Sequence, residues 1–419
     1  MQEDLLNDDN NSTRRTQLAF IGMRLMGTPF WCLLSMLAFI LYKKLHLNPL
    51  QITLIVALKP ASSLLSLYWS QAIYQRPDKI IKNLIGANFF RHLPFLFIPW
   101  IQSPWFIIFA FGLYMMLTRA TIPAWMELFK YNLPKRKQEE MVGYGTTIDF
   151  LGAAVLTIGM GVLLDSYQGV WEWLFSFAAG FGILSSLFLI SIPMQYTSIS
   201  CSGIRQQKFN IKQKIFKPWQ QVWQLIARRR DFTIFQIGFM LGGSGLMIMQ
   251  PALPQFFVDI LHLSFTEMGV AIALCKGIGV ALTSPLWTRL FRRSNIFQLS
   301  ALVTIFAAFF PIFLFASSFH ISLLYFAYAF YGIMQAGSEL SWHMSGLVFA
   351  QESDSSTFSI TNVLTVGMRG CIVPALGSLL LPFIQPLGVL LSGVLLCLLA
   401  SGYFLFNSRS STFPEKSRG

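Results

Sequence analysis

Long apolar segments separated by short polar ones run along almost the whole chain. Each holds about 20 or more residues, the length that an α-helix needs to cross the hydrocarbon core of a bilayer. Strands of a membrane barrel would instead alternate apolar and polar residues over about ten positions. The pattern therefore predicts an all-α, polytopic membrane protein with twelve transmembrane helices. They are expected at residues 17–42, 50–73, 80–101, 105–128, 141–164, 171–193, 232–257, 266–288, 294–317, 322–348, 358–381 and 386–406.

The longest interval without such a segment is 196–231, with six predicted helices on each side of it. We expect an N-terminal six-helix bundle at 1–195, a basic linker at 196–231 and a C-terminal six-helix bundle at 232–419. Apolar linker residues recur every three or four positions, which predicts an amphipathic helix; they are Ile211, Ile215, Trp219, Val222, Trp223 and Ile226. Because Lys and Gln fill its other face, we expect this helix to lie at the membrane surface, with a calmodulin-type or lipid-sensing target as the alternative.

The cations are unevenly divided between the two sides of this layout. Of the 31 Lys and Arg residues, most lie in the two tails, the linker and the other even-numbered connections, whereas the odd-numbered connections hold only Lys43 and Lys44. Because Lys and Arg near helix ends stay on the cytoplasmic side, we expect both termini and the linker in the cytoplasm of a bacterium, with the chain in its cytoplasmic (inner) membrane. This distribution also accounts for the net charge of +13 without a nucleic-acid partner.

Composition and motifs argue against an enzyme. Hydrophobic residues make up 54% of the chain and charged residues 12%, compared with roughly 25% charged residues in soluble domains. The run Gly242-Gly243-x-Gly245 lies inside an apolar segment, and no Gly-Lys-Ser/Thr of a phosphate loop follows it. The five cysteines lack metal-ligand spacing, and we find neither a His or carboxylate cluster nor a nucleophile elbow. We therefore expect no enzymatic activity, no cofactor and no metal.

Two connections carry a weak internal repeat. The connection after the eighth helix reads Ser284-Pro-Leu-Trp-Thr288-Arg289-Leu-Phe-Arg292-Arg293, and the one after the second helix retains Arg76 and Lys79 but has Tyr74 and Pro77 within the repeat. These connections resemble the Gly-x-x-x-Asp-Arg-x-Gly-Arg-Arg loop motif of the major facilitator superfamily, with Thr288 and Tyr74 at the Asp position. Trp171-Glu-Trp173-Leu-Phe175 is similar to another motif of that family. The resemblance implies two pseudo-symmetric bundles around a central cavity, which transport solutes by rocking against each other.

Six ionisable residues inside the predicted helices are candidates for the transport site, because such groups are costly in a membrane. Arg24, Arg119 and Asp149 share a layer roughly 10–14 Å from the cytoplasmic ends, and Lys276, Glu339 and Arg369 lie roughly 14–18 Å deep. All six fall on helices that line the cavity in the family that the chain resembles. The excess of cations favours an anionic or carboxylate-bearing solute, with substrate contacts from Arg24, Arg119, Lys276 and Arg369. The alternative is that Arg24–Asp149 and Arg369–Glu339 are structural pairs.

A proton-coupled carrier also needs a group that gains and loses a proton during the cycle. Glu339 is the first candidate, followed by Asp149 and by His343, one helical turn after Glu339. The resemblance further assigns the loop residues Arg289, Arg292 and Arg293, together with Arg76 and Lys79, to a gating motif.

We therefore expect a secondary active transporter of the major facilitator type, a symporter or antiporter that moves a small anionic or carboxylate-bearing solute by alternating access with a proton or an exchanged solute. We expect it to act as a monomer in the lipid bilayer. One alternative is a non-transporting receptor or assembly factor on the same fold. The other is a multidrug exporter, although a surplus of buried cations suits cationic drugs poorly.

Overall fold

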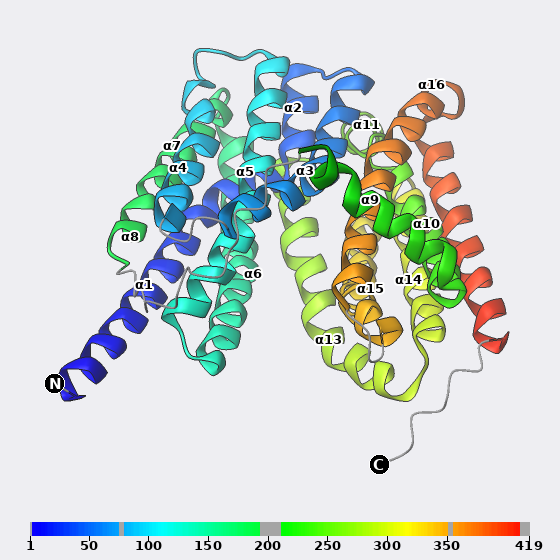
Figure 1. The fold of residues 1–419 in the computed structure, drawn as a ribbon. Coiled ribbons are helices and arrows are strands. Elements are labelled where there is room, and N and C mark those ends of the chain that lie inside the picture. Colours follow the sequence, from blue (N-terminus) through cyan, green and yellow to red (C-terminus); the bar gives the residue numbers. More distant parts are fainter. Residues whose placement is uncertain (1, 75–78, 193–210, 351–354, 411–419) are drawn as a thin grey trace. The chain divides into compact units, whose positions relative to one another are not determined.

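The computed structural model describes residues 2–74, 79–192, 211–350 and 355–410. Within these ranges the regular structure is entirely helical, as Figure 1 shows. This confirms the all-α fold that the apolar pattern predicts. Of the predicted features, Arg76, Cys201 and the first part of the linker lie outside the described residues.

Seven stretches of the described residues form helices that are long and apolar enough to cross a membrane. They are Thr13–Ser35, Pro104–Lys130, Val170–Ile190, Arg230–Ile260, Phe265–Arg293, Ile296–Ser317 and Ile360–Ser408. The last stretch belongs to α16 (Ser355–Ser410), in which Gln385 has a φ of 59°. A residue with positive φ interrupts a helix, and Gln385 lies between the spans predicted at 358–381 and 386–406, both of which fall within α16. The protein is thus an integral multi-pass membrane protein, and the count of twelve spans stays a prediction.

By internal contacts the chain forms two compact units. Unit 1 comprises Met1–Leu41, Ser62–Lys214 and Ser264–Gly269, and unit 2 comprises Tyr42–Ala61, Ile215–Leu263 and Val270–Gly419. The helices α2 (Leu37–Leu45) and α3 (Pro49–Tyr74) contribute residues to both units.

Unit 1 is built mainly on α1 (Gln2–Ser35), which packs against α6 (Lys135–Ser166) and α7 (Val170–Leu184). Its other helices are α4 (Ile80–His92), the 3₁₀ turn η2 (Leu93–Phe97), α5 (Pro104–Asn132), α8 (Ser186–Ile190) and α12 (Phe265–Gly269). The α-helix of the predicted span 80–101 changes to 3₁₀ geometry where Pro94, which lacks a backbone N–H, enters η2. Buried aromatic rings of Phe30, Phe95, Tyr114 and Phe175 fill its interior.

Unit 2 contains four long helices that pack side by side: α10 (Arg230–Ile248), α14 (Ile296–Ser317), α15 (Ser322–Ala350) and α16. Six buried phenylalanines from these helices form one aromatic cluster: Phe232, Phe235, Phe297, Phe349, Phe358 and Phe404. The remaining helices are α11 (Leu253–Gln255), the π-helical turns η4 (Phe256–Ile260) and η5 (Val270–Cys275), and α13 (Lys276–Arg293). A π-helical turn therefore directly precedes Lys276, one of the candidate site residues.

The amphipathic pattern of the linker corresponds to α9 (Ile211–Arg228). Val222 is buried, whereas Phe216 and Trp223 are 67% and 63% exposed. Because positions seven residues apart lie on the same helical face, these two rings form an exposed apolar strip. The expected helix is present, and its position at a membrane surface stays a prediction.

Candidate functional site

The cavity that contains a candidate site residue lies inside unit 2, between α10, α14, α15 and α16. Its volume is about 200 Å³. Glycines and apolar residues of α10 line one side of the cavity, and side-chain hydroxyls come from α14 and α15. The lining residues are Phe239, Gly242, Gly243, Leu246, Met247, Gln250, Ser300, Val303, Thr304, Ala307, Tyr331, Met334, Ser338, Ser341, Arg369 and Phe404.

Arg369 is the charged residue of this cavity and is only 7% exposed. Its Nη1 donates to the backbone oxygen of Phe239 at 2.8 Å, and its guanidinium lies over the Phe239 ring, 5.6 Å from the centroid. Its Nε has no hydrogen-bond partner. Among the described residues, no carboxylate forms an ion pair with Arg369. A buried cation thus keeps donor capacity next to an open cavity.

Gly243 makes room for this guanidinium. A Cβ at this position would overlap the Nη1 and Cζ atoms of Arg369. The absence of a side chain at Gly243 therefore sets where the positive charge lies, which gives part of the Gly242-Gly243-x-Gly245 run a structural purpose.

Two further polar groups of the cavity lack partners. The hydroxyls of Ser300 and Ser341 are buried and make no hydrogen bond, whereas the Thr304 hydroxyl donates to the backbone oxygens of Ser300 and Ala301. Sequence reasoning missed Ser300 and Ser341. Their spacing was a usable signal, because Ser300 and Thr304 are four positions apart and Ser338 and Ser341 three, which places each pair on one helical face.

Glu339 does not pair with Arg369, so the proposed structural pair between them is wrong. Glu339 is exposed and accepts a hydrogen bond of 2.8 Å from Gln335 Nε2. The cavity is lined instead by Ser338 and Ser341 of the same helix. One helical position changes the direction of a side chain by about 100°, so Glu339 leaves α15 on a different side from these serines.

Lys276 lies beside the cavity without lining it. Its Nζ is 5.1 Å from the centroid of the Tyr331 ring, and Tyr331 is a lining residue. Lys59 and Glu339 lie within electrostatic range of Lys276.

In unit 1, Arg24 and Asp149 form the expected ion pair, with 2.5 Å between Nη1 and Oδ2. Their side chains are 41% and 36% exposed, and the guanidinium of Arg24 lies over the Phe20 ring. Arg119, on α5, is half-buried and makes no ion pair with the described residues. Of the two candidate cations of unit 1, Arg24 is thus neutralised by Asp149, whereas Arg119 is not neutralised by a described carboxylate.

The remaining candidates lie away from the cavity. His343 is exposed on α15, and Lys79 is the exposed residue before α4. Arg289, Arg292 and Arg293 are exposed near the C-terminal end of α13. Cations at this end of a helix complement the negative pole of its dipole.

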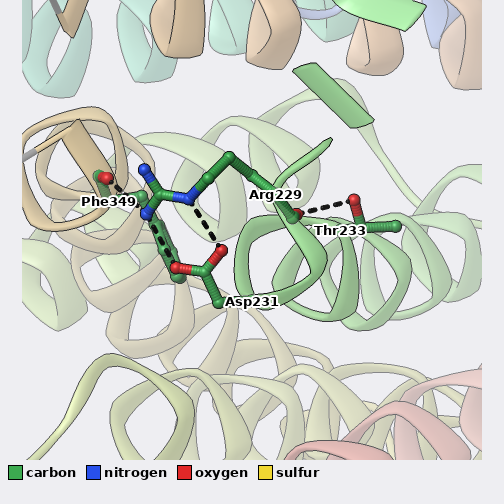
Figure 2. Close-up of polar contacts among 4 residues, drawn as sticks. All are labelled: Arg229, Asp231, Thr233 and Phe349. Atoms are coloured by element: carbon green, nitrogen blue, oxygen red, sulfur yellow. Dashed lines mark hydrogen bonds and ion pairs between the residues drawn. The ribbon is translucent and has the colours of Figure 1, made fainter. Parts of the chain in front are cut away.

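A polar cluster that sequence reasoning did not anticipate joins α10 to α15 (Figure 2). Arg229 donates through Nε and Nη2 to the two carboxylate oxygens of Asp231, at 3.0 and 2.8 Å, and Nη2 also donates to the backbone oxygen of Phe349 at 2.9 Å. The Thr233 hydroxyl donates to the backbone oxygen of Arg229. Hydrogen bonding to Asp231 raises the pKa of Arg229. The cluster ties the start of α10 to the last residues of α15.

The described residues hold no group of three or more His, Cys, Asp or Glu side chains that could bind a metal ion. The chemistry of the cavity is thus that of a buried cation, hydroxyls and apolar side chains. This arrangement can bind a solute, and it offers no nucleophile–base pair.

Comparison with solved structures supports a transporter fold. A POT family transporter in complex with 5-aminolevulinic acid is similar with a TM-score of 0.72 at 12% identity, over 96% of this chain and 97% of that one. A mutant of the nucleoside transporter NupG has a TM-score of 0.70 at 12% identity, over 94% and 98%. A bacterial homolog of the human lysosomal transporter Spinster, inward-facing and unoccupied, has a TM-score of 0.65 at 12% identity, over 95% and 97%.

The sequence has no significant match among curated proteins. A family model described as Major Facilitator Superfamily matches residues 19–367, most of the chain. The match agrees with the helical membrane fold and with the loop motif after α13. The chain therefore belongs to the major facilitator superfamily and is a membrane transporter rather than an enzyme.

Proposed function

We propose that this protein is a secondary active transporter that moves a small anionic or carboxylate-bearing solute by alternating access. The observation that carries the proposal is the unpaired guanidinium of Arg369 beside a cavity. A buried cation without a counter-ion is unfavourable, and a bound anion would supply both the missing charge and acceptors for the free N–H groups. Arg119, Lys276 and Arg24 remain candidates for further contacts with the solute.

One neighbour supports this class of solute. The POT family transporter is in complex with 5-aminolevulinic acid, which carries a carboxyl group and also an amino group. The nucleoside transporter shows that the same fold also accepts other solutes, so the argument for an anion rests on Arg369 and not on the fold. The cavity has no carboxylate among its lining residues, and this disfavours an exporter of cationic drugs.

We further propose proton coupling through Glu339, which lies within electrostatic range of Lys276. A carboxylate near a cation can take up a proton when the cation moves away and release it when the cation returns. Asp149 is the second candidate, but its ion pair with Arg24 suits a permanent structural contact better. His343, exposed one turn after Glu339, could hand protons to it.

The remaining elements of the proposal follow from sequence and family. The charge distribution supports two six-helix bundles, 1–195 and 232–419, joined by a cytoplasmic linker, with both termini in the cytoplasm of a bacterial inner membrane. We propose a monomer as the functional unit.

The loop residues would favour one conformational state of the transport cycle; they are Arg289, Arg292 and Arg293, with Arg76 and Lys79. The transport rate of a variant in which Arg289, Arg292 and Arg293 are neutralised tests this gating role.

The experiment is solute counterflow in proteoliposomes. Purified protein is reconstituted into liposomes that are loaded with one unlabelled solute at a time, anionic, neutral or cationic, and supplied with the same solute in radiolabelled form. Protein-free liposomes are the control. We expect saturable accumulation of at least one carboxylate, and its loss in Arg369→Ala. Accumulation of only neutral or cationic solutes, or no transport of any anion, would contradict the proposal.

A further inference from the structure

We infer that the cavity of unit 2 selects solutes with a single carboxylate attached to an apolar body. This inference rests on the proposed transport of anions and narrows it from anions in general to one chemical class. It depends on the number of charged side chains that line the cavity, on the lining hydroxyls that make no hydrogen bond, and on the apolar side chains that form the rest of the lining.

The charge of the cavity is that of one cation. Arg369 lines it, whereas Asp, Glu, Lys and His are absent from the lining residues. Lys276 contacts the ring of Tyr331 but is not itself a lining residue. One guanidinium neutralises one carboxylate, so a phosphate monoester or a dicarboxylate would keep an uncompensated charge in a buried site.

The polar groups suit the two oxygens of a carboxylate. The guanidinium of Arg369 has free donor capacity at Nε, and planar guanidinium groups match carboxylates in two-point contacts. The unpartnered hydroxyls of Ser300 and Ser341 add two more donors in the same cavity. Since buried polar groups are normally hydrogen-bonded, these three orphaned groups together indicate a missing partner. The Nε–H of Arg369 can only donate, so this partner must accept at least one hydrogen bond.

The rest of the lining is mainly apolar. Leu246, Met247, Val303, Ala307 and Met334 are apolar, and the neutral lining residue Gln250 can accept a hydrogen bond but cannot neutralise an ammonium group. An amino acid would therefore bury its positive charge near Arg369 without a lining carboxylate to neutralise it.

The volume of the cavity limits the size of the solute. An engineered cavity of about 150 Å³ holds benzene, so a volume of about 200 Å³ holds a solute of roughly eight non-hydrogen atoms.

The test uses radiolabelled 4-methylpentanoate and the purified full-length protein in detergent. Competitors of matched shape each change one property: 4-methylpentanamide removes the charge, leucine adds an ammonium group, and glutarate replaces the apolar end with a second carboxylate. We expect saturable binding of 4-methylpentanoate, with each competitor weaker than the unlabelled parent acid by roughly tenfold or more. The same compounds are then tested for counterflow in proteoliposomes.

Single substitutions test whether 4-methylpentanoate binds in the cavity of unit 2. Arg369→Ala should weaken binding by roughly a hundredfold or more and Ser300→Ala should weaken it less, whereas Ser317→Ala serves as the matched control. Ser317 is also a buried serine of α14, but its hydroxyl already donates to the Leu314 backbone oxygen and it does not line the cavity. Should Arg369→Ala fail to reach the membrane, Arg369→Lys combined with Ser300→Ala replaces it.

The outcomes separate this inference from the proposed function. Absence of 4-methylpentanoate binding, equal binding of glutarate or leucine, or equal effects of Ser300→Ala and Ser317→Ala would overturn the inference. If counterflow nevertheless occurs with glutarate or inorganic phosphate, the protein is still an anion transporter and only the solute class is wrong. If no anion is transported, the proposed function fails as well.

Discussion

The guanidinium of Arg369 occupies the space that a side chain on Gly243 would need. The same guanidinium donates to the backbone oxygen of Phe239, one helical turn before Gly243, so α10 both admits the cation and holds it. A buried arginine without a carboxylate partner is thus held by the backbone oxygen and the ring of Phe239. This relationship makes it possible to displace the positive charge without removing it.

Gly243→Ala should lower solute binding and transport by roughly tenfold, about 1.4 kcal/mol. The added methyl group overlaps the guanidinium, which must move away from Phe239 and from the cavity. Counterflow measured per amount of reconstituted protein gives the effect. Gly277→Ala is the control, because no heavy atom lies within 4 Å of the position that its Cβ would take. Equal activities of the two variants would show that the position of Arg369 is unimportant.

Arg369→Lys should weaken binding by about 1.5–3 kcal/mol, roughly ten- to hundredfold, which is close to the effect of Arg369→Ala. A lysine keeps the charge but cannot present the planar pair of donors that a carboxylate accepts. Competition binding with the labelled solute measures the loss. Full affinity in the lysine variant would mean that charge alone matters.

Arg119→Ala tests whether an unpaired arginine of unit 1 also contacts the solute. Arg119 is half-buried and unpaired among the described residues, unlike Arg24, which Asp149 neutralises. We therefore expect Arg119→Ala to reduce transport by roughly tenfold if it contacts the solute. Normal binding and transport by this variant would assign Arg119 a structural role.

Glu339→Gln should abolish accumulation driven by a pH gradient while exchange of labelled for unlabelled solute continues. Glutamine keeps the shape and the hydrogen bond to Gln335 but cannot take up a proton. Both activities are measured in the same proteoliposome preparation. Unchanged accumulation in response to the pH gradient would remove Glu339 from the coupling mechanism, and loss of both activities with poor expression would point to a structural role.

Arg229→Lys should destabilise the protein by about 1 kcal/mol, because lysine cannot bind both Asp231 oxygens and the Phe349 oxygen at once. The side chains of Arg229 and Asp231 are 33% and 32% exposed, so solvent screens part of the interaction. The midpoint of thermal unfolding in detergent reports the change. Arg228→Lys, at an exposed neighbouring position, is the control, and an equal shift in both variants would show that the cluster adds no stability.

Cys201 provides a test of orientation. The basic linker that contains it is expected in the cytoplasm, so a membrane-impermeant thiol reagent should label it only after the cells are opened. The experiment uses a background in which the other four cysteines are replaced. Labelling in intact cells would reverse the proposed topology.

The sequence by itself determined the membrane class, the helical architecture, the family and the amphipathic helix of the linker. These features depend on the length of each apolar segment and on the spacing of apolar residues within it. Both can be read from the residues of a single segment, without knowledge of its neighbours in space. It also identified Arg369, because an arginine within an apolar segment stands out from its surroundings. The ion pair between Arg24 and Asp149 was likewise accessible as one of two alternatives.

Only the tertiary structure decided which buried charges are paired and which side chains line the cavity. Residues that face lipid and residues that face other helices are both apolar, so the pattern does not fix the rotation of a membrane helix about its axis. Glu339 could therefore not be distinguished from Ser338 or Ser341. The contact between Arg369 and Phe239 spans 130 positions of the sequence, and no local pattern records it. The cavity combines these groups because packing of distant helices leaves one cation without a counter-ion and two hydroxyls without hydrogen-bond partners.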